Sequence, residues 1–411
     1  MEEKLERIEK LKEMEIGLIP RNWKLVRLEN IACFETGKRM KGGALKSGGA
    51  FSIGGEHITD DGNVKFSPLK FISKDFYFKM KKGIVKIGDI LICKDGAKAG
   101  KTAFVKYLPY QYCAVNEHVF IVRSKNTNKL LNEFLFFYLY SKHGQMQMGK
   151  AFHGLIGGIT QKDLSELLIF LPPIDEQKKI AYVLSTIQNA KEKTEQIIEV
   201  SKALKKSLMK HLFKYGPVPL DEVDKVKLKE TEIGLIPEDW DVVSLKEIAE
   251  VKYGKAKPKD DGNIPVVGSG GVYSRTSKAL VNHPTIVIGR KGTAGKPWLI
   301  LEPCYPSDTT FYLVLKKAVD LLFIFYFMLL NPLSGEYAKT TLPSLQKPDL
   351  ENFIIPFPPI EDQKKIAEIL SALDRKIEAE ENKKKALEEL FKSMLHNLMT
   401  GKIRVKDLEV S

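Results

Sequence analysis

The chain has 411 residues, 43% of them hydrophobic, and its 65 Lys and Arg against 52 Asp and Glu give a formal net charge of +13. This length predicts two to three domains with ordinary globular cores. The longest apolar run, residues 321–330, is too short for a membrane span of about 20 residues, and the charged N-terminus has no apolar signal core, so we expect a cytoplasmic location.

Net charge and cysteine content limit the kinds of ligand that we expect. The positive excess favours a polyanion such as DNA or RNA, the alternative being a basic protein that binds none. The four cysteines are scattered without a CxxC pair, and the seven histidines show no ligand spacing. We therefore expect no metal and no cofactor.

An internal repeat organises the chain. Residues 15–32, EIGLIPRNWKLVRLENIA, share 11 of 18 positions with residues 232–249, EIGLIPEDWDVVSLKEIA. Residues 172–185, PPIDEQKKIAYVLS, share 10 of 14 with residues 358–371, PPIEDQKKIAEILS. The intervening stretches agree poorly, and the first holds 31 more residues. A tandem duplication with variable contents is typical of one scaffold that presents two different recognition surfaces.

Each variable stretch predicts an α+β globular domain. Short β-like runs lie between Gly, Pro and Asn residues, and one apolar helical stretch follows them. The expected strands are 83–93, 102–107 and 115–123 in the first copy and 285–289, 298–301 and 310–315 in the second. The expected helices are 130–140 and 319–330.

A glycine turn in the first copy, KDGAKAGKTAF from Lys94 to Phe104, resembles the end of a nucleotide-binding P-loop. The spacing is wrong, because Asp95 stands where the first glycine is required. In the second copy the equivalent turn is one residue shorter, and Pro297 replaces the Mg²⁺-binding hydroxyl. Both copies keep a strand, a glycine turn and basic residues, which favours phosphate contact by lysine and backbone N–H groups over nucleotide hydrolysis.

A long helix follows each Pro-Pro-Ile. Acidic residues occupy its first turn, where the helix dipole favours them, and no Gly or Pro occurs over 175–213 or 360–399. Apolar residues recur about every 3.5 positions, which predicts a two-stranded coiled coil, with a helical bundle as the alternative. The expected stripes are Ile180, Val183, Ile187, Ala190, Ile197, Leu204 and Leu208, and Ile366, Ile369, Leu373, Ile377, Leu387, Leu390 and Met394.

Two enzymatic alternatives are weak. Pro172-Pro173 and Pro358-Pro359 resemble part of an adenine methyltransferase motif, but the preceding polar residue and the following aromatic ring are missing. A nuclease signature over Asp349, Asp362 and Lys364 would need residues on neighbouring strands, whereas Asp362 and Lys364 lie in a helical turn.

The order of variable domain, PPI-xx-QKKIA helix, E-I-G-x-I-P-x-x-W block, second domain and second helix resembles the DNA-specificity subunit of type I restriction–modification systems. The resemblance implies two target-recognition domains that each read half of a bipartite asymmetric DNA site. It also implies spacer helices that dock two adenine-methylating modification subunits, with restriction (helicase/nuclease) subunits joining them, and no chemistry in this chain. The alternatives are a fused or stand-alone DNA methyltransferase and a P-loop NTPase.

The expected architecture is α+β, with two target-recognition domains joined by two long antiparallel coiled-coil helices in pseudo-twofold symmetry. The expected boundaries are 1–171 for the first domain, 172–214 for the first helix, 215–231 for a linker, 232–357 for the second domain and 358–411 for the second helix.

Basic residues in the loops of both copies are the expected DNA contacts, and arginine suits bidentate reading of guanine better than lysine does. Arg39, Arg275 and Arg290 are therefore the expected base contacts. The full expected DNA-binding set is Lys38, Arg39, Lys41, Lys46, Lys94, Lys98, Lys101, Lys255, Lys257, Lys259, Arg275, Arg290, Lys291 and Lys296. The expected partner-docking residues are Gln177, Lys178, Gln363 and Lys364.

Overall fold

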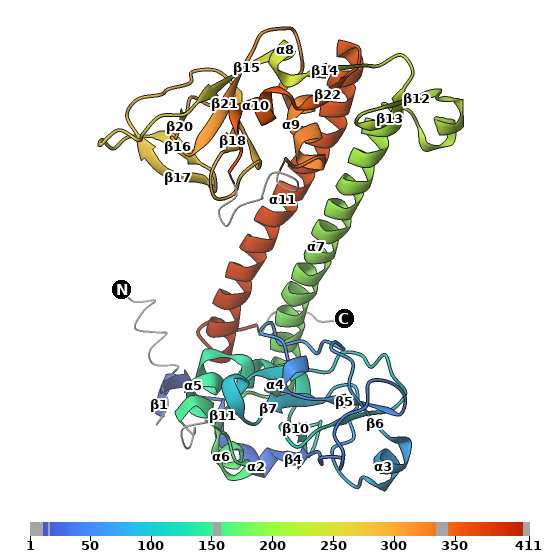
Figure 1. Cartoon of the computed structure of the whole chain (residues 1–411). Helices are drawn as coiled ribbons and strands as arrows, with labels where there is room; N and C mark the ends of the chain where they lie inside the picture. The colour runs from blue at the N-terminus through green and yellow to red at the C-terminus, as the bar shows by residue number, and fades with distance from the viewer. Residues whose placement is uncertain (1–10, 15–16, 151–157, 334–343, 406–411) are drawn as a thin grey trace. The chain divides into compact units, whose positions relative to one another are not determined.

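The computed structural model describes residues 11–14, 17–150, 158–333 and 344–405 (Figure 1). Two residues of the first repeated block, Glu15 and Ile16, lie outside this part. The chain divides into two compact units, residues 1–193 with 384–411 and residues 194–383. Each unit therefore holds one repeat's globular part together with segments of both long helices.

A four-stranded antiparallel sheet and a three-stranded sheet form the body of unit 1. Their strand orders are β4-β10-β7-β8 and β6-β5-β9, and β5 pairs with β9 in parallel. The strands are β4 (Ala32–Thr36), β5 (Ala50–Ile53), β6 (Phe71–Ile72), β7 (Ile90–Cys93), β8 (Thr102–Phe104), β9 (Cys113–Val115) and β10 (Val119–Ser124).

Unit 2 repeats this topology. Its sheets have the orders β15-β21-β18-β19 and β17-β16-β20, and β16 pairs with β20 in parallel as β5 does with β9. The variable stretches therefore share a fold that their sequences do not reveal. The strands are β15 (Ala249–Tyr253), β16 (Ile264–Gly268), β17 (Gly271–Thr276), β18 (Thr285–Gly289), β19 (Pro297–Ile300), β20 (Tyr305–Pro306) and β21 (Thr310–Leu315).

Further strand pairs frame each copy. A strand that follows the repeated Trp pairs with the strand that leads into the Pro-Pro-Ile, and a short hairpin precedes it. Residues 228–231, expected in the linker, belong to the second hairpin. The pairs are β3 (Lys24–Arg27) with β11 (Leu168–Leu171), β14 (Asp241–Ser244) with β22 (Ile354–Phe357), β1 (Leu11–Met14) with β2 (Gly17–Pro20), and β12 (Leu228–Thr231) with β13 (Gly234–Pro237).

Short helices cover the sheets. The apolar helix of each copy is confirmed: α4 (Asn132–Tyr140) and α9 (Leu321–Leu330) each supply several fully buried aromatic residues to the core of their unit. The remaining short helices are α2 (Leu28–Ile31), η1 (Gly55–His57), α3 (Lys74–Lys79), η2 (Gly96–Lys98), α5 (Lys142–Lys150), α6 (Gln161–Glu166), η3 (Leu220–Lys225), α8 (Leu245–Ile248) and α10 (Lys347–Glu351).

The long helices are observed as α7 (Ile174–Tyr215, 42 residues) and α11 (Ile360–Met399, 40 residues), so the second helix, expected over 358–411, ends at Met399. In unit 2, ion pairs Lys202–Glu381 (2.6 Å) and Lys205–Asp374 (2.5 Å) join them. In unit 1, the end of α11 packs with the start of α7 in one core. The two helices therefore run antiparallel within each unit, while a coiled coil along their full length stays a prediction.

The predicted apolar stripe of α7 is wrong past its first turns. Ile197 and Leu204 are 37% and 48% exposed, whereas Thr194, Ile198 and Ser201 are buried. Ile369 and Leu390 of α11 are exposed as well, at 38% and 47%. The buried positions 180, 184, 187, 194, 198 and 201 keep a heptad spacing whose middle layers are partly polar. The prediction followed apolar residues alone, so it assigned the wrong helix face where the buried positions become polar, at Thr194 and Ser201.

No helix in the described ranges is both long and apolar enough to span a bilayer.

We predict that one of the four cysteines reacts quickly in the native protein. Cys33 is exposed, whereas Cys93, Cys113 and Cys304 are buried. Burial raises the pKa of the Cys113 and Cys304 thiols to about 11, which lowers their thiolate fraction. Iodoacetamide at pH 8 followed by peptide mass spectrometry should find fast alkylation at Cys33 alone. Equal labelling of Cys304 would contradict the burial that the fold assigns to it.

Candidate nucleic-acid interface

A basic turn joins two antiparallel strands at the same place in each unit. In unit 1 it connects β7 to β8, where Ile92 pairs with Thr102, and in unit 2 it connects β18 to β19, where Ile288 pairs with Pro297. The equivalence inferred from the sequence therefore holds in the fold. The turns need glycine because Gly96, Gly100, Gly292 and Gly295 all have φ between 75° and 83°.

Several backbone N–H groups of the two turns are already hydrogen-bonded within their hairpins. In unit 1 the backbone N–H groups of Ala99, Gly100 and Lys101 donate to carbonyls inside the turn, and in unit 2 Gly295 does the same. The Thr102 hydroxyl is buried and donates to Gly100 O at 3.0 Å. These four N–H groups are therefore already hydrogen-bonded, and a phosphate contact through the rest of each turn stays a prediction.

Carboxylates pair with two of the predicted cations of unit 1, Lys101 and Arg39. Lys101 forms an ion pair with Asp60, and Arg39 lies 3.8 Å from Glu117. His118 bridges the carboxylates of Asp95 (2.9 Å) and Glu117 (3.3 Å). These contacts connect the loop that carries Arg39 to the β7–β8 turn, and they offset part of its positive charge.

Aromatic rings take the place of carboxylates in unit 2. The Arg290 guanidinium lies 5.5 Å from the centre of the Tyr253 ring, which Lys347 also approaches at 6.0 Å. Lys296 Nζ lies 4.1 Å above Trp298. Among the described residues, no carboxylate forms an ion pair with Arg290, Lys291 or Lys296. Cation–π contacts hold these groups in place without cancelling their charge.

The other residues predicted to contact DNA are mostly exposed and make fewer contacts with the rest of the protein. Lys94 lies 5.7 Å above Phe120, and the Arg275 guanidinium donates to Asn263 O. The backbone N–H of Lys255 donates to Pro306 O at 3.0 Å and that of Arg290 to Thr309 O at 2.8 Å, so one loop positions both residues. The described contacts do not bring the remaining lysines to the turns: Lys38, Lys41, Lys46, Lys257 and Lys259.

Sequence reasoning missed the residues that position these cations: Tyr253, Trp298, Lys347 and His118. A weak signal existed for two of them, because Tyr253 and Trp298 each lie two residues from a predicted lysine. Lys347 and His118 come from distant segments, and only the tertiary fold brings them in.

The expected docking glutamines are internal. Gln177 is fully buried, donates to Lys129 O and Pro172 O at 2.9 Å each, and accepts from Leu131 N. Gln363 likewise donates to Pro358 O and accepts from Asp320 N. These two side chains tie each long helix to its own globular part, which corrects their expected role. Lys178 and Lys364 are exposed, so their docking role stays a prediction.

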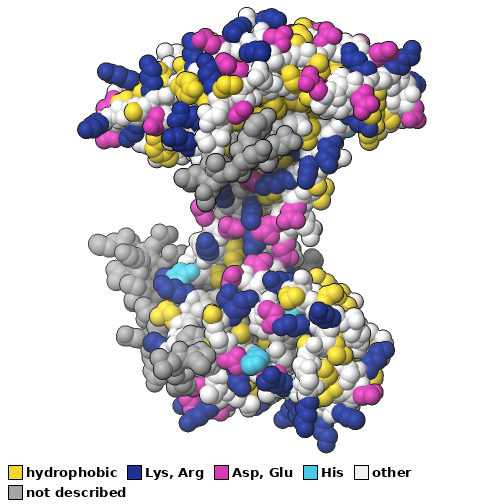
Figure 2. Space-filling model, in the orientation of Figure 1, with side chains coloured by type: hydrophobic (Ala, Val, Ile, Leu, Met, Phe, Trp, Pro, Cys, Tyr) yellow, Lys and Arg dark blue, Asp and Glu magenta, His cyan; other side chains and the backbone are white. Residues whose placement is uncertain are grey.

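The surface shows the basic character without a single stripe. Figure 2 shows Lys and Arg side chains over much of the visible face of each unit, with Asp and Glu among them. The described part of the chain holds no cluster of three or more His, Cys, Asp or Glu side chains that could bind a metal ion.

The chain thus holds two copies of one α+β fold, each with a basic turn on the same hairpin, as a DNA-specificity protein with a duplicated domain would. The family described as type I restriction modification DNA specificity domain matches residues 20–202 and 237–389, and the chain belongs to that family.

Similar proteins cover nearly the whole chain. The type I restriction enzyme MjaVIII specificity subunit of Methanocaldococcus jannaschii is 29% identical, and the putative type I restriction enzyme MjaX specificity subunit of the same organism is 30% identical, with 97% of each chain covered in both cases. Among solved structures, the type I restriction–modification S subunit from M. genitalium has the same fold, with a TM-score of 0.68, 18% identity and coverage of 92% of this chain and 96% of that one.

We predict that charge reversal weakens DNA binding more in unit 2 than in unit 1. Lys296→Glu removes a positive charge that no described carboxylate offsets, whereas Lys101→Glu removes one already paired with Asp60. Each lost phosphate contact should flatten the log–log salt dependence by about one, so K296E should change the slope and K101E should change it less. Fluorescence anisotropy across a salt series measures both, and equal slopes for the two variants would contradict this charge assignment.

Proposed function

We propose that this chain is the DNA-binding specificity subunit of a type I restriction–modification enzyme, and that each globular region reads one half of a bipartite asymmetric site. The observation that carries the proposal is the family match in both repeats, together with a basic turn on the same hairpin of each copy. The turns differ in their surroundings, carboxylates in one and aromatic rings in the other. Different half-sites are the expected consequence.

The long helices are proposed to set the distance between the half-sites and to dock the modification subunits. An uninterrupted helix of 42 residues extends about 63 Å at 1.5 Å per residue, long enough to separate two DNA contacts. A solved structure of the type I R-M system, determined in a study of complex assembly and conformational transition, aligns with 94% of this chain at a TM-score of 0.52 and 18% identity. That likeness shows the fold alone, and partner subunits enter here as part of the proposal.

The functional segments follow the repeat. We assign target recognition to residues 1–171 and 228–357, spacing and docking to 172–214 and 358–411, and the connection to 215–227, because residues 228–231 belong to the second hairpin. Methylation of adenine belongs to the modification subunits and cleavage to the restriction subunits, which would join this chain on double-stranded DNA.

The test is a methylation assay with all combinations of subunits. The chain alone should neither methylate DNA nor hydrolyse ATP, because its glycine turn lacks the P-loop spacing and its Thr102 hydroxyl is buried. Modification subunits with the chain should methylate adenines at one bipartite sequence, and modification subunits alone should not. ATP turnover by the chain that disappears in Lys101→Ala would favour the NTPase alternative, and methylation by the chain alone would favour the methyltransferase.

A further inference from the structure

In unit 1, an arginine just after the end of α11 binds the start of α7 and the repeated Asn-Trp segment. Arg404 donates from Nε to Glu176 Oε1 at 2.5 Å and from a terminal nitrogen to Glu176 Oε2 at 2.8 Å. It also donates to Asn22 Oδ1 at 3.1 Å and lies 5.9 Å from the Trp23 ring centre. The Trp23 indole N–H donates to the same Glu176 at 3.1 Å, so two acceptors and one ring hold the guanidinium.

The duplication supplies the counterpart of each of these groups in unit 2. The repeated blocks align Trp240 with Trp23, Asp239 with Asn22, and Asp362 with Glu176. Gly216 follows α7 as Gly401 follows α11, both with positive φ, and a side chain on either glycine would approach the repeated Pro and Trp. The acceptor positions are therefore kept, and both are now carboxylates.

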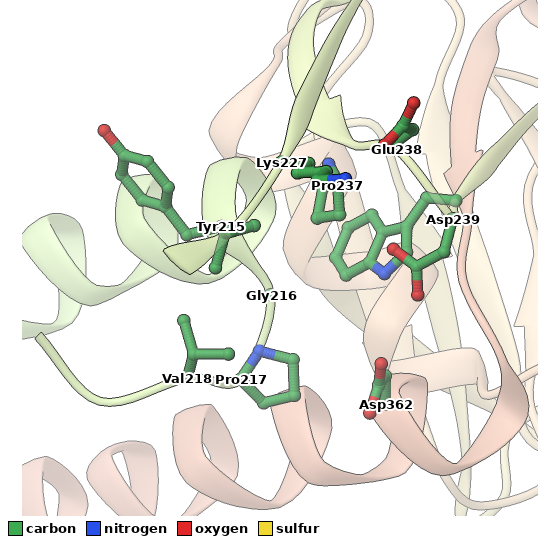
Figure 3. A pocket seen from close by; sticks show the side chains of 11 residues that line it. Tyr215, Gly216, Pro217, Val218, Lys227, Pro237, Glu238, Asp239 and Asp362 are labelled. Atoms are coloured by element: carbon green, nitrogen blue, oxygen red, sulfur yellow. The ribbon is translucent and has the colours of Figure 1, made fainter. Parts of the chain in front are cut away.

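Among the described residues of unit 2, no arginine takes the place of Arg404. Arg404 lies three residues after Gly401, and the residue three after Gly216 is Pro219, which is exposed. A pocket of about 440 Å³ lies at this junction, lined by Gly216, Asp239, Trp240 and Asp362 among others. Figure 3 shows Asp239 and Asp362 on the wall of this pocket, beside the Gly216–Pro217 turn.

We propose that this pocket binds an arginine side chain of a partner protein, in the way that the equivalent groups of unit 1 bind Arg404. A planar guanidinium can donate to two carboxylates at once and stack on an indole, which a lysine ammonium cannot reproduce. The partner assignment rests on the proposed function: the modification subunit is the protein expected at the start of each long helix, where Asp362 lies.

The local charges leave room for a cation. Glu238 also lines the pocket, and Lys227 is the basic residue on its wall. Lys365 reaches Asp362 only at 3.6 Å, and its own side chain is 63% exposed. With three acids against Lys227 on the wall and Lys365 paired with Asp362, the pocket keeps a net negative charge that an arriving arginine would neutralise.

The first test uses the chain's three tryptophans as separate reporters. In the full-length protein with ¹⁵N-labelled indoles, L-argininamide should shift the Trp240 signal in a saturable way and leave the Trp23 and Trp298 signals in place. L-lysinamide should shift the Trp240 signal at least threefold less at the same concentration. No shift at Trp240, or equal shifts of all three indoles, would overturn the proposal.

Three variants sharpen the result. Pro219→Arg places an arginine at the position of Arg404 and should abolish the response, and Asp239→Asn with Asp362→Asn should abolish it by removing both carboxylates. Arg404→Ala should make Trp23 responsive, because it opens the same site in unit 1. A retained Trp240 shift in the double asparagine variant, with its circular dichroism unchanged, would overturn the site.

The second test addresses the partner. Affinity for purified modification subunits should fall at least tenfold in Pro219→Arg and in the double asparagine variant, while DNA binding by the chain alone stays the same. Unchanged assembly would overturn the partner assignment even if argininamide binds. A chain that binds no specific DNA but still takes argininamide at Trp240 would instead show that the proposed function is wrong and the pocket right.

Discussion

Lengthening both long helices by seven residues should lengthen the preferred DNA spacer by about three base pairs. Seven residues are one heptad, so an insertion next to Thr194 in α7 and next to Glu380 in α11 keeps the buried face in register. The added length is about 10 Å at 1.5 Å per residue, and a base pair occupies about 3.4 Å. The half-site sequences should not change, because the strands and turns that read them are untouched.

The measurement is selection from a DNA library with a randomised spacer, with the modification subunits present. Three extra base pairs rotate the second half-site by about a third of a turn around the DNA, so affinity should fall while the preferred spacer still shifts. Insertion in α7 alone is the matched control, since it breaks the register with α11 and should weaken selection without defining a new spacer. An unchanged spacer in the double insertion would mean that the helices do not set the distance.

Removing the buried carboxylate of Asp89 should destabilise unit 1 by about 3 kcal/mol, the lower end of the usual cost of breaking a buried ion pair, because Arg123 keeps Glu35 as a second partner. The Asp89 side chain is 3% exposed and accepts from Arg123 Nε at 2.6 Å and from a terminal nitrogen at 2.7 Å. The hydrogen bond from Arg123 to Asp89 raises the pKa of the guanidinium. In Asp89→Ala the charged arginine loses this partner and keeps only its contacts to Glu35 and Ile84 O.

Unit 2 supplies the matched control. The registers of the four-stranded sheets align Asp89 with Thr285 and Arg123 with Val314. Thr285 is fully buried and donates to Leu313 O at 2.7 Å, so this pair fills the same place without charge. In calorimetry, the unit 1 transition of D89A should fall by about 10 °C, and the double variant D89T/R123V should regain most of it. Equal melting of D89A and the double variant would show that the loss of Asp89 as a partner of Arg123 is not the cause.

The sequence predicts the two long helices and the two glycine turns well because local sequence signals determine them. The two Pro-Pro-Ile starts and the absence of Gly and Pro locate α7 and α11 within a few residues. The glycines of the two turns mark positions that only glycine occupies without strain, so the equivalence of the hairpins is visible before the fold is known.

The wrong predictions concern residues whose contacts come from a distant segment of the chain. Gln177 looks like a surface residue in an exposed first turn, but its amide satisfies three backbone groups from two other segments. Lys101 looks free, but Asp60 arrives from another loop. The shared sheet order of the two variable stretches needs only similar hydrophobic patterns at equivalent strands, and this leaves little identity to detect.

The central claim is that two different recognition regions in one chain read two separated DNA sequences. Selection of random DNA by the complex of this chain with its modification subunits tests it most directly. The selected pool should contain two unlike half-sites at a fixed distance with no preference between them, and Arg290→Ala should relax only the half-site read by unit 2. A single continuous site, two identical half-sites, or relaxation of both half-sites in R290A would contradict the account.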